Sequence, residues 1–320
     1  MSNIIGSDSI VFNQGNLIPS ANNNQYQVNF TGGKTFKNDK IAVKSISLPY
    51  SWKNISAAYG NNVFQILWPL TQQSSTATSM ITYTITVPDG FYTIAQLNTY
   101  LQQYCINNGL YLIASTGGVT PTLGSNVYFI SCQTNSNYYS VEFDFFPLPL
   151  SAAISSTGAG TGVSYKYPSN FPTTTTGFTS NFNPLLIVPA VAAGDNITFS
   201  SLIGYAPGTY PSASPYNASN VVIGSQSTFA PEVTPVQSII IGCSLVSNKF
   251  GVNNAVIGSF GYQNTTFGQV ILYQPGFAWY SNMLDGSFNN IIITFWDQNF
   301  NPLPIYDSTV TVELSVITTA

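Results

Sequence analysis

The chain has 320 residues, of which 44% are hydrophobic and 14% aromatic, so it can bury a large core in about one or two domains. Only 6% of the residues are charged, against about 25% in an average protein, and the sequence contains neither histidine nor arginine. These absences exclude Ser-His and Cys-His nucleophile pairs, imidazole metal ligands and bidentate arginine clamps on phosphate groups.

A surface with so few charges must be built from the abundant Asn, Ser, Thr, Gln and Tyr side chains. Soluble monomers normally keep apart through net charge and mixed ionic groups, so their scarcity indicates that partners cover much of the exterior. The net charge of −4 also opposes binding to nucleic acid, because that affinity comes mainly from Lys and Arg contacts with phosphates. The composition therefore favours a protein that works inside an assembly.

Residues 1–25 are predominantly polar, and we expect them to form an N-terminal arm that becomes ordered only against partners. The segment MSNIIGSDSIVFNQGN lacks a basic region followed by a long apolar run, so it predicts neither a secretory signal nor a membrane anchor. No later stretch approaches the roughly 18 apolar residues that span a bilayer.

Apolar residues alternate with polar ones along much of the remaining chain, which is the pattern of strands with one buried face. Residues 62–68 and 290–296 are apolar on both faces and predict central or covered strands. Gly, Pro and Asn clusters separate these segments at spacings typical of a sandwich or barrel, so the sequence predicts an all-β protein. The alternating segments are residues 25–30, 80–87, 139–145, 238–245 and 309–316.

Five of the seven lysines lie in the short segment 34–54. If residues 40–47 form a strand, Ile41 and Val43 lie on one side and Lys44 on the other, while the earlier lysines belong to the turn that leads in. Lysines at a sheet edge block unwanted strand pairing. We favour that role, or a polar contact with a neighbouring subunit, over a basic patch for nucleic acid.

One segment follows helical rather than strand periodicity. The apolar positions Ile94, Leu97, Leu101, Tyr104 and Cys105 share the spacing of one helix face. Just before them, Thr93 and Gln96 are placed as a capping box, and Gly109 stands where a helix usually ends. The sequence therefore predicts a single amphipathic helix whose apolar stripe packs against the β-core.

The cysteines and acidic residues give little sign of chemistry. Cys105, Cys132 and Cys243 are odd in number and far apart, which indicates small buried residues rather than disulfides or a metal site. Glu142 and Asp144 could share a strand face at about 7 Å, as paired carboxylates of a glycosidase do. We favour the simpler interpretation that they form the exposed side of an amphipathic strand.

Two other acidic residues, Asp297 and Asp307, flank the loop QNFNPLPIY. Aspartate side chains readily bond to the local backbone, so both are predicted to form turns rather than to bind calcium. We therefore predict no catalytic residues, no cofactor and no metal site.

Residues 150–235 are rich in Pro, Gly, Ser and Thr and almost free of charge, a texture that could mark a disordered linker. The same segment contains many Phe, Leu, Ile and Tyr residues. This apolar content predicts a small packed insertion or a set of long ordered loops.

Four segments resemble the minor capsid, or penton, proteins of virophages and of the related Polinton-like viruses. The resemblance implies a single jelly-roll domain of two packed antiparallel sheets, expected here over residues 26–149 and 236–320, with residues 150–235 as an insertion. It also implies that five copies close the icosahedral vertex of the virion, assembled inside the host cell. Together with the missing catalytic residue types, this predicts that the protein is no enzyme. The neighbouring capsomers would be a double jelly-roll major capsid protein. The matching segments are KIAVKSISLPYSWKNI (40–55), VPDGFYTIAQLNTYLQ (87–102), VQSIIIGCSLVSN (236–248) and IIITFWDQNFNPL (291–303).

In that setting the lysine-rich segment is predicted to lie at a subunit boundary or inner rim. The aromatic side chains would supply apolar contact and the lysines would meet a carboxylate or carbonyl of the neighbour. The candidate interface residues are Lys34, Lys37, Lys40, Lys44, Tyr50, Trp52 and Lys53.

Two other function classes stay open at the level of sequence. A receptor-binding or glycan-binding head could use Tyr205, Tyr210 and Tyr216 to contact a host surface receptor or stack on sugar. A carbohydrate-active enzyme of sandwich fold would depend on Glu142.

Overall fold

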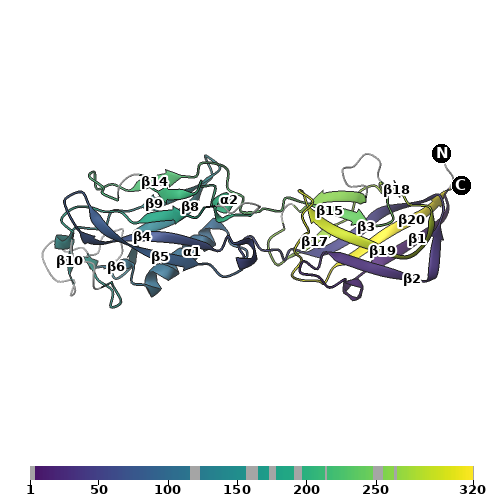
Figure 1. Ribbon diagram of the computed structural model, residues 1–320, viewed down its shortest axis with the longest axis horizontal. Helices are drawn as coiled ribbons and strands as arrows, with labels where there is room; N and C mark the ends of the chain where they lie inside the picture. Colours follow the sequence, from purple (N-terminus) through teal and green to yellow (C-terminus); the bar gives the residue numbers. More distant parts are fainter. Residues whose placement is uncertain are drawn as a thin grey trace. The chain divides into compact units, whose positions relative to one another are not determined.

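The computed structural model describes residues 4–115, 123–155, 165–172, 178–190, 197–212, 215–247, 255–262 and 265–319. The chain divides into two compact units, drawn in Figure 1. Unit 1 comprises Met1–Lys53 and Val236–Ala320, and unit 2 comprises Asn54–Pro235. Unit 2 is therefore an insertion into unit 1.

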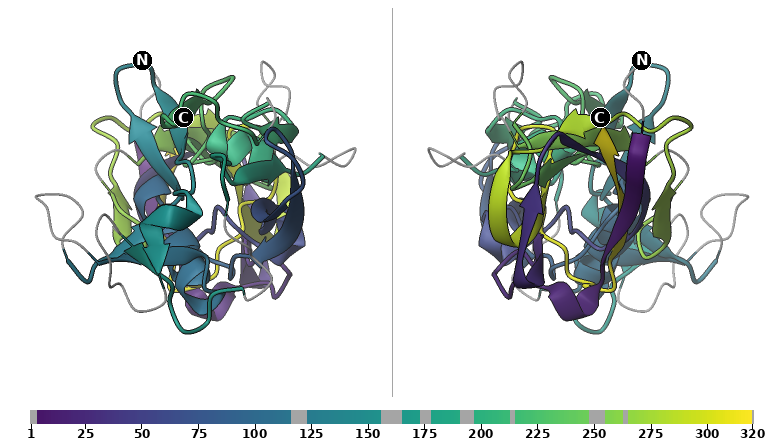
Figure 2. Two further views of the ribbon diagram at one scale, coloured as in Figure 1. Left: turned by 90° about the vertical axis from the view of Figure 1, so that its left-hand side faces the viewer. Right: turned by 90° about the vertical axis from the view of Figure 1, so that its right-hand side faces the viewer.

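Unit 1 contains two antiparallel sheets. One has the strand order β1-β20-β3-β17, with β18 also paired to β3, and the other has the order β16-β15-β19-β2. Figure 2 (right) views this unit along its length, with the purple N-terminal strands beside the yellow C-terminal ones. The strands are β1 (Ile4–Phe12), β2 (Gln25–Phe36), β3 (Asp39–Pro49), β15 (Ser238–Cys243), β16 (Val256–Gly261), β17 (Val270–Tyr273), β18 (Ser281–Asn282), β19 (Gly286–Asp297) and β20 (Thr311–Thr319).

The pairing order identifies the fold of unit 1. When the short β18 is set aside, eight strands remain in the described part of the unit. In chain order the first, eighth, third and sixth form one sheet, and the second, seventh, fourth and fifth form the other. Such an arrangement of two Greek keys over two sheets is a jelly roll. The predicted fold class, an all-β jelly-roll sandwich, is confirmed.

Alternation along the strands builds the core of unit 1. On β20, Val312, Leu314 and Val316 are buried, and Leu314 and Val316 lie opposite Val43 and Ile41 of β3. In the second sheet, β15 is buried on both faces from Ile239 to Cys243, whereas its alternating pattern predicted a single buried face. The strands expected at 25–30, 40–47, 238–245, 290–296 and 309–316 are all present.

The N-terminal segment belongs to the jelly roll. β1 pairs with β20 from Ile4↔Thr319 to Phe12↔Val312, and the side chain of Phe12 is fully buried. The two chain ends consequently lie side by side (Figure 1). The expectation of an arm that orders only against partners is wrong, because the strand partner is the C-terminal strand of the same chain.

The structure also divides the chain elsewhere than the expected boundary at residue 150. Strand β4 pairs with β12 (Leu67↔Leu185), and β9 pairs with β14 (Phe145↔Ile223). Strands from both sides of residue 150 therefore share sheets. Residues 54–149 fold with residues 150–235, and none of their described strands belongs to the jelly roll.

The described residues of unit 2 form three small sheets, with orders β10-β11-β6-β7, β13-β12-β4-β5 and β14-β9-β8. The alternating segments 80–87 and 139–145 and the apolar segment 62–68 are among its strands, as predicted. The strands are β4 (Val63–Gln72), β5 (Thr78–Thr86), β6 (Tyr111–Ala114), β7 (Asn126–Tyr128), β8 (Ile130–Asn135), β9 (Ser140–Phe145), β10 (Ile154–Ser155), β11 (Tyr165–Lys166), β12 (Leu185–Val188), β13 (Gly208–Tyr210) and β14 (Ile223–Gln226).

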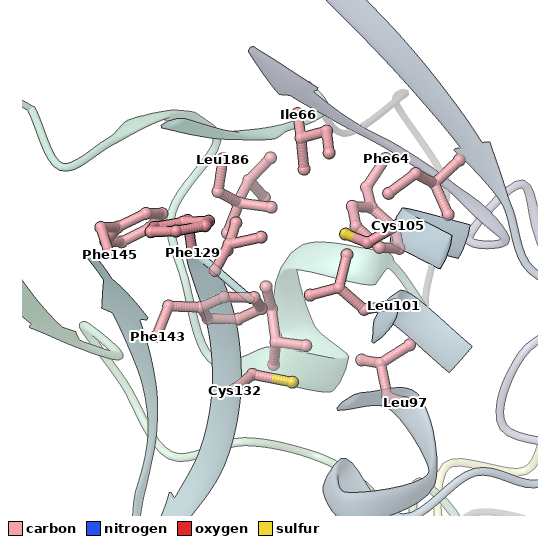
Figure 3. Close-up of a cluster of buried hydrophobic side chains, with 14 of the residues drawn as sticks. Phe64, Ile66, Leu97, Leu101, Cys105, Phe129, Cys132, Phe143, Phe145 and Leu186 are labelled. Carbon is pink, nitrogen blue, oxygen red and sulfur yellow. The ribbon is translucent and has the colours of Figure 1, made fainter. Parts of the chain in front are cut away.

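The core of unit 2 lies between the two sheets that contain β4 and β9, with helix α1 (Ile94–Asn107) packed against it. Figure 3 shows Leu97, Leu101 and Cys105 of α1 pointing into the same cluster as Phe64 and Phe143. Cys105 and Cys132 are buried members of this cluster, and Cys243 is buried in unit 1. The prediction that the helix lays its apolar stripe on the β-core is confirmed.

Both ends of α1 follow the predicted signals. The Thr93 hydroxyl accepts a hydrogen bond from Gln96 N, and the Gln96 side chain accepts one from Thr93 N, which completes the capping box. At the other end, Gly109 N donates to Ile106 O and Leu110 N donates to Cys105 O. This is a Schellman motif, and it places Gly109 at φ +71° in the left-handed region.

A second short helix, α2 (Phe199–Ile203), was not predicted. Its signals are present in the sequence, since Thr198 and Ser201 form a capping box and Gly204 ends the helix at φ +74°. In the described part of the chain, no helix combines the length and hydrophobicity that a bilayer crossing demands.

Each unit is closed where the chain passes between them. In unit 2 the buried Asn54 side chain donates to Val233 O at 2.9 Å and to Tyr92 O at 2.8 Å. These two bonds, the Asn54 clamp, tie the first residue of the unit to its end. In unit 1 the Tyr262 hydroxyl donates to Val236 O, and the Tyr262 ring packs against Trp52. The chain segments that join the two units are therefore each held by contacts within their own unit.

We predict that the fragment 54–235 folds by itself. The fragment keeps every strand of its sheets and the Asn54 clamp, so it should unfold cooperatively, with a free energy of unfolding of about 5–15 kcal/mol. Urea denaturation followed by circular dichroism measures this. The fragment 26–149, which lacks β12 and β14, should remain unfolded, and a folded 26–149 together with an unfolded 54–235 would refute the division.

We predict that Gly109→Ala strongly destabilises unit 2. A Cβ there would stand 2.1 Å from Asn170 O, a backbone atom, in addition to the cost of about 1–2 kcal/mol for a left-handed alanine. Gly60→Ala is the matched control, because Gly60 has φ +68° with no atom within 4 Å of a Cβ. Amide hydrogen exchange of unit 2 peptides should show a clearly larger loss for Gly109→Ala, whereas equal losses would contradict the clash.

Candidate assembly surfaces

Two lysines of the segment 34–54 form ion pairs within the chain. Lys44 Nζ on β3 lies 2.7 Å from Glu313 Oε1 on β20, and Lys34 Nζ on β2 lies 4.0 Å from Asp8 Oδ2 on β1. The hydrogen bond from Lys44 lowers the pKa of Glu313. All four side chains are partly or largely exposed, so the pairs contribute little to stability.

The other lysines of the segment differ in their surroundings. Lys53 Nζ lies 4.2 Å from the centre of the Tyr306 ring, a cation–π contact. Lys37 and Lys40 form no ion pair among the described residues. Because Lys40 and Lys44 lie on β3, which has partners on both sides, the edge-blocking role expected of them is wrong. Only Lys34 lies on an outer strand, β2.

Tyr50 and Trp52 do not reach the surface. Their side chains are 2% and 1% exposed, and their ring centres lie 4.5 Å apart. Tyr262 and Phe267 pack on the same cluster, at 4.9 and 5.9 Å from the Tyr50 ring. The expectation that these two aromatics supply contact to a neighbour is wrong, because the segment after β3 turns them into the protein interior.

The tyrosines proposed for a glycan are core residues of unit 2. Tyr205 is fully buried, and its hydroxyl accepts a hydrogen bond from Phe143 N at 3.2 Å. Burial raises the pKa of this hydroxyl to about 12. Tyr210 and Tyr216 are partly buried against the same core. Tyr205 is therefore wrong as a sugar-stacking residue, since a buried ring cannot meet a ligand without unfolding.

Glu142 and Asp144 lie on the outer face of β9, while Val141, Phe143 and Phe145 are buried on the other face, as predicted. Gln133 Nε2 donates to Asp144 Oδ2 at 3.0 Å, and Asn135 Nδ2 donates to Glu142 Oε2 at 3.2 Å. Partial burial raises the pKa of Asp144, and the charge of Glu142 adds to this. Among the described residues no cluster of three or more Cys, Asp and Glu side chains could hold a metal ion.

The two loop aspartates form turns, as predicted. Asp297 Oδ1 accepts hydrogen bonds from Asn299 N and Asn301 N, and Asp307 Oδ1 accepts from Thr309 N and Thr309 Oγ1.

The three cysteines are thiols of low reactivity, because burial raises the pKa of Cys105 and Cys132 to about 12 and that of Cys243 to about 11. At neutral pH none supplies the thiolate that a nucleophile needs.

The most exposed apolar surface of unit 1 follows strand β17. This β17 edge patch comprises Val270 and Leu272, which are 50% and 79% exposed, and Phe277 and Trp279 in the following loop, which are 81% and 78% exposed. Exposed apolar clusters of this kind on soluble proteins mark interaction sites. The sequence signal was available, since VILYQPGFAWY is apolar on both strand faces, but nothing local shows that β17 ends a sheet.

The opposite edge of the same sheet is also apolar. In the order β1-β20-β3-β17, strand β1 is the other outer strand, and it exposes Ile4, Ile5 and Val11 at 61%, 68% and 50%. Its one charged residue is Asp8. Natural proteins usually protect free edges with charge, proline or a covering segment, because unpaired N–H and C=O groups invite another strand. Here both edges keep apolar side chains.

A hollow of about 210 Å³ adjoins the β17 edge patch. It lies between β16 and β17, and its walls include Val43, Ile257, Gly258, Tyr273 and Trp279. Engineered apolar cavities of about 150 Å³ accept benzene, so this space suffices for one apolar side chain.

No protein-family model matches the chain, and no curated relative matches it. Among solved structures, the chain is similar to a crystal structure of the selenomethionine-labelled mavirus penton protein. The sequences are 12% identical, the alignment covers 98% of each chain, and the TM-score is 0.42. The strand pairing order described above, rather than this likeness, identifies the jelly roll.

Proposed function

We propose that the chain is a structural capsid protein whose copies associate head to tail through the two apolar edges of one jelly-roll sheet. The observation that carries the proposal is the pair of unlike, unprotected edges at β1 and β17. A cyclic assembly needs two different patches that match between neighbours, and a single sheet with two such edges supplies them.

The residues define how the contact would form. The β17 edge patch of one copy meets β1 of the next, with Ile4 or Ile5 entering the hollow beside Trp279. Unpaired backbone groups along both strands add hydrogen bonds, as in other cases of strand addition. Low charge helps here, because like charges on identical neighbours would oppose closure.

The resemblance of four sequence segments to virophage penton proteins supports a more specific assignment. On that basis the ring contains five copies, closes the five-fold vertex of an icosahedral virion and binds a double jelly-roll major capsid protein. The protein would assemble inside the host cell and perform no reaction. The lysines of the segment 34–54 would then make only polar contacts with the neighbouring subunit at the boundary. They are Lys34, Lys37, Lys40, Lys44 and Lys53.

We predict that Val270→Lys/Leu272→Lys weakens self-association at least about tenfold, because each interface would bury two uncompensated charges. Sedimentation velocity over a range of concentrations measures the mass of the assembly against the 34.5 kDa chain. Val221→Lys is the matched control, since Val221 is a 56% exposed valine in unit 2. The edge contact would be refuted if the double variant still formed the ring that the wild type forms. It would also be refuted if Val221→Lys weakened the ring as much as the double substitution does.

We predict a smaller effect for Lys37→Ala/Lys40→Ala/Lys44→Ala/Lys53→Ala. Rim charges act mainly on association rate, so ring formation should slow by about threefold to tenfold at low salt and converge with wild type at high salt. Light scattering during assembly measures the rate. Lys166→Ala in unit 2 controls for the loss of positive charge. An unchanged assembly rate in the quadruple variant would show that these lysines have no role at the interface.

A further inference from the structure

A cavity of about 770 Å³ opens in unit 2. Its lining includes residues of the small sheet whose strands β6 and β10 are labelled in Figure 1. The segment Phe146–Leu150, the end of β7 and strand β11 form its walls. Ligand sites for small molecules typically have volumes of about 300–1,000 Å³. The cavity therefore has room for two linked sugar rings.

Aromatic and proline side chains line this cavity. Tyr128, Phe146 and Tyr165 are half-buried, so each keeps part of its ring open. The wall is held firmly, because Phe146 N donates to Phe129 O and Leu148 N donates to Phe182 O, both at 2.9 Å. The described lining contains no Lys, Asp or Glu. Such a site offers nothing to compensate a phosphate or carboxylate, so it favours a neutral ligand.

Two asparagines supply polar groups to the lining. Asn181 and Asn220 are among the residues that line the cavity, and neither side chain makes a hydrogen bond within the described part of the chain. Each amide offers both donors and an acceptor. A sugar hydroxyl likewise donates and accepts, whereas the carbonyls of a proline-rich peptide only accept. The amides therefore match a sugar better than a peptide.

A third asparagine fixes both of them. Asn217 N donates to Asn181 O at 2.9 Å, and Asn220 N donates to Asn217 O at 3.3 Å. The Asn217 side chain is buried, and its Nδ2 donates to Asn183 Oδ1 and Val221 O. This network holds the backbones of Asn181 and Asn220 in place while their side chains stay available. Pre-organisation of this kind reduces the entropy lost on binding.

We propose that this cavity binds a neutral glycan, with a sugar ring stacked on Tyr128, Phe146 or Tyr165 and its hydroxyls bonded to Asn181 and Asn220. The proposal goes beyond the capsid role and does not depend on it. The cavity, unlike the buried Tyr205, is open to a ligand from solvent.

The test uses the full chain and saturation-transfer NMR with N-acetyllactosamine and chitobiose, for which we expect a Kd of about 1 mM or below. Asn181→Ala and Asn220→Gly should each weaken binding about tenfold. Asn220 has φ +50°, so glycine fits there without strain, and Asn38→Gly, at φ +58° in unit 1, is the matched control. Tyr165→Leu should also weaken binding, because it removes one of the three aromatic rings that line the cavity.

Several outcomes would overturn the proposal. They are no transfer from either disaccharide at about 10 mM, binding that both asparagine variants leave unchanged, and much tighter binding of sialyllactose than of its neutral core. Binding of a polyproline peptide in place of sugar would identify a peptide groove. Sedimentation of the same variants should match wild type, so failure here stays distinguishable from failure of the edge contact.

Discussion

The jelly roll depends on the placement of its last strand between the first and the third. β20 pairs with β1 along one side and β3 along the other, so the C-terminus completes a sheet that the N-terminus began. Once these pairings form, β1 and β17 are necessarily the outer strands. The surface that we assign to association is thus a direct product of strand order, because those strands have no further partner in the described chain.

The scarcity of charged residues leaves these outer strands with little protection against pairing. A free strand edge on an ordinary soluble protein is protected by lysine or by a covering segment. Here Lys40 and Lys44 lie on an inner strand, and Lys44 is engaged by Glu313, so neither lysine protects an apolar edge. The same scarcity leaves the unit 2 cavity neutral. One compositional property therefore shapes both a protein contact and a ligand preference.

Local features were predictable and long-range ones were not. Alternation located the main strands, and Thr93, Gln96 and Gly109 located α1, because these signals act over a few residues. The boundary at residue 150 failed because a composition change marks loops, while domain membership depends on pairings such as Leu67 with Leu185. Tyr50, Trp52 and Tyr205 were misread for a related reason. An aromatic ring serves a core and a contact surface equally well, and only the fold decides between them.

The Asn54 clamp has a consequence for how such a chain can change over time. Because unit 2 begins and ends at one tied point in a single connection of the jelly roll, its sequence can drift, lengthen or be exchanged without altering the register of any jelly-roll strand. A lineage could retain one conservative scaffold while diversifying what that scaffold carries, and an engineer could graft a foreign domain at the same junction.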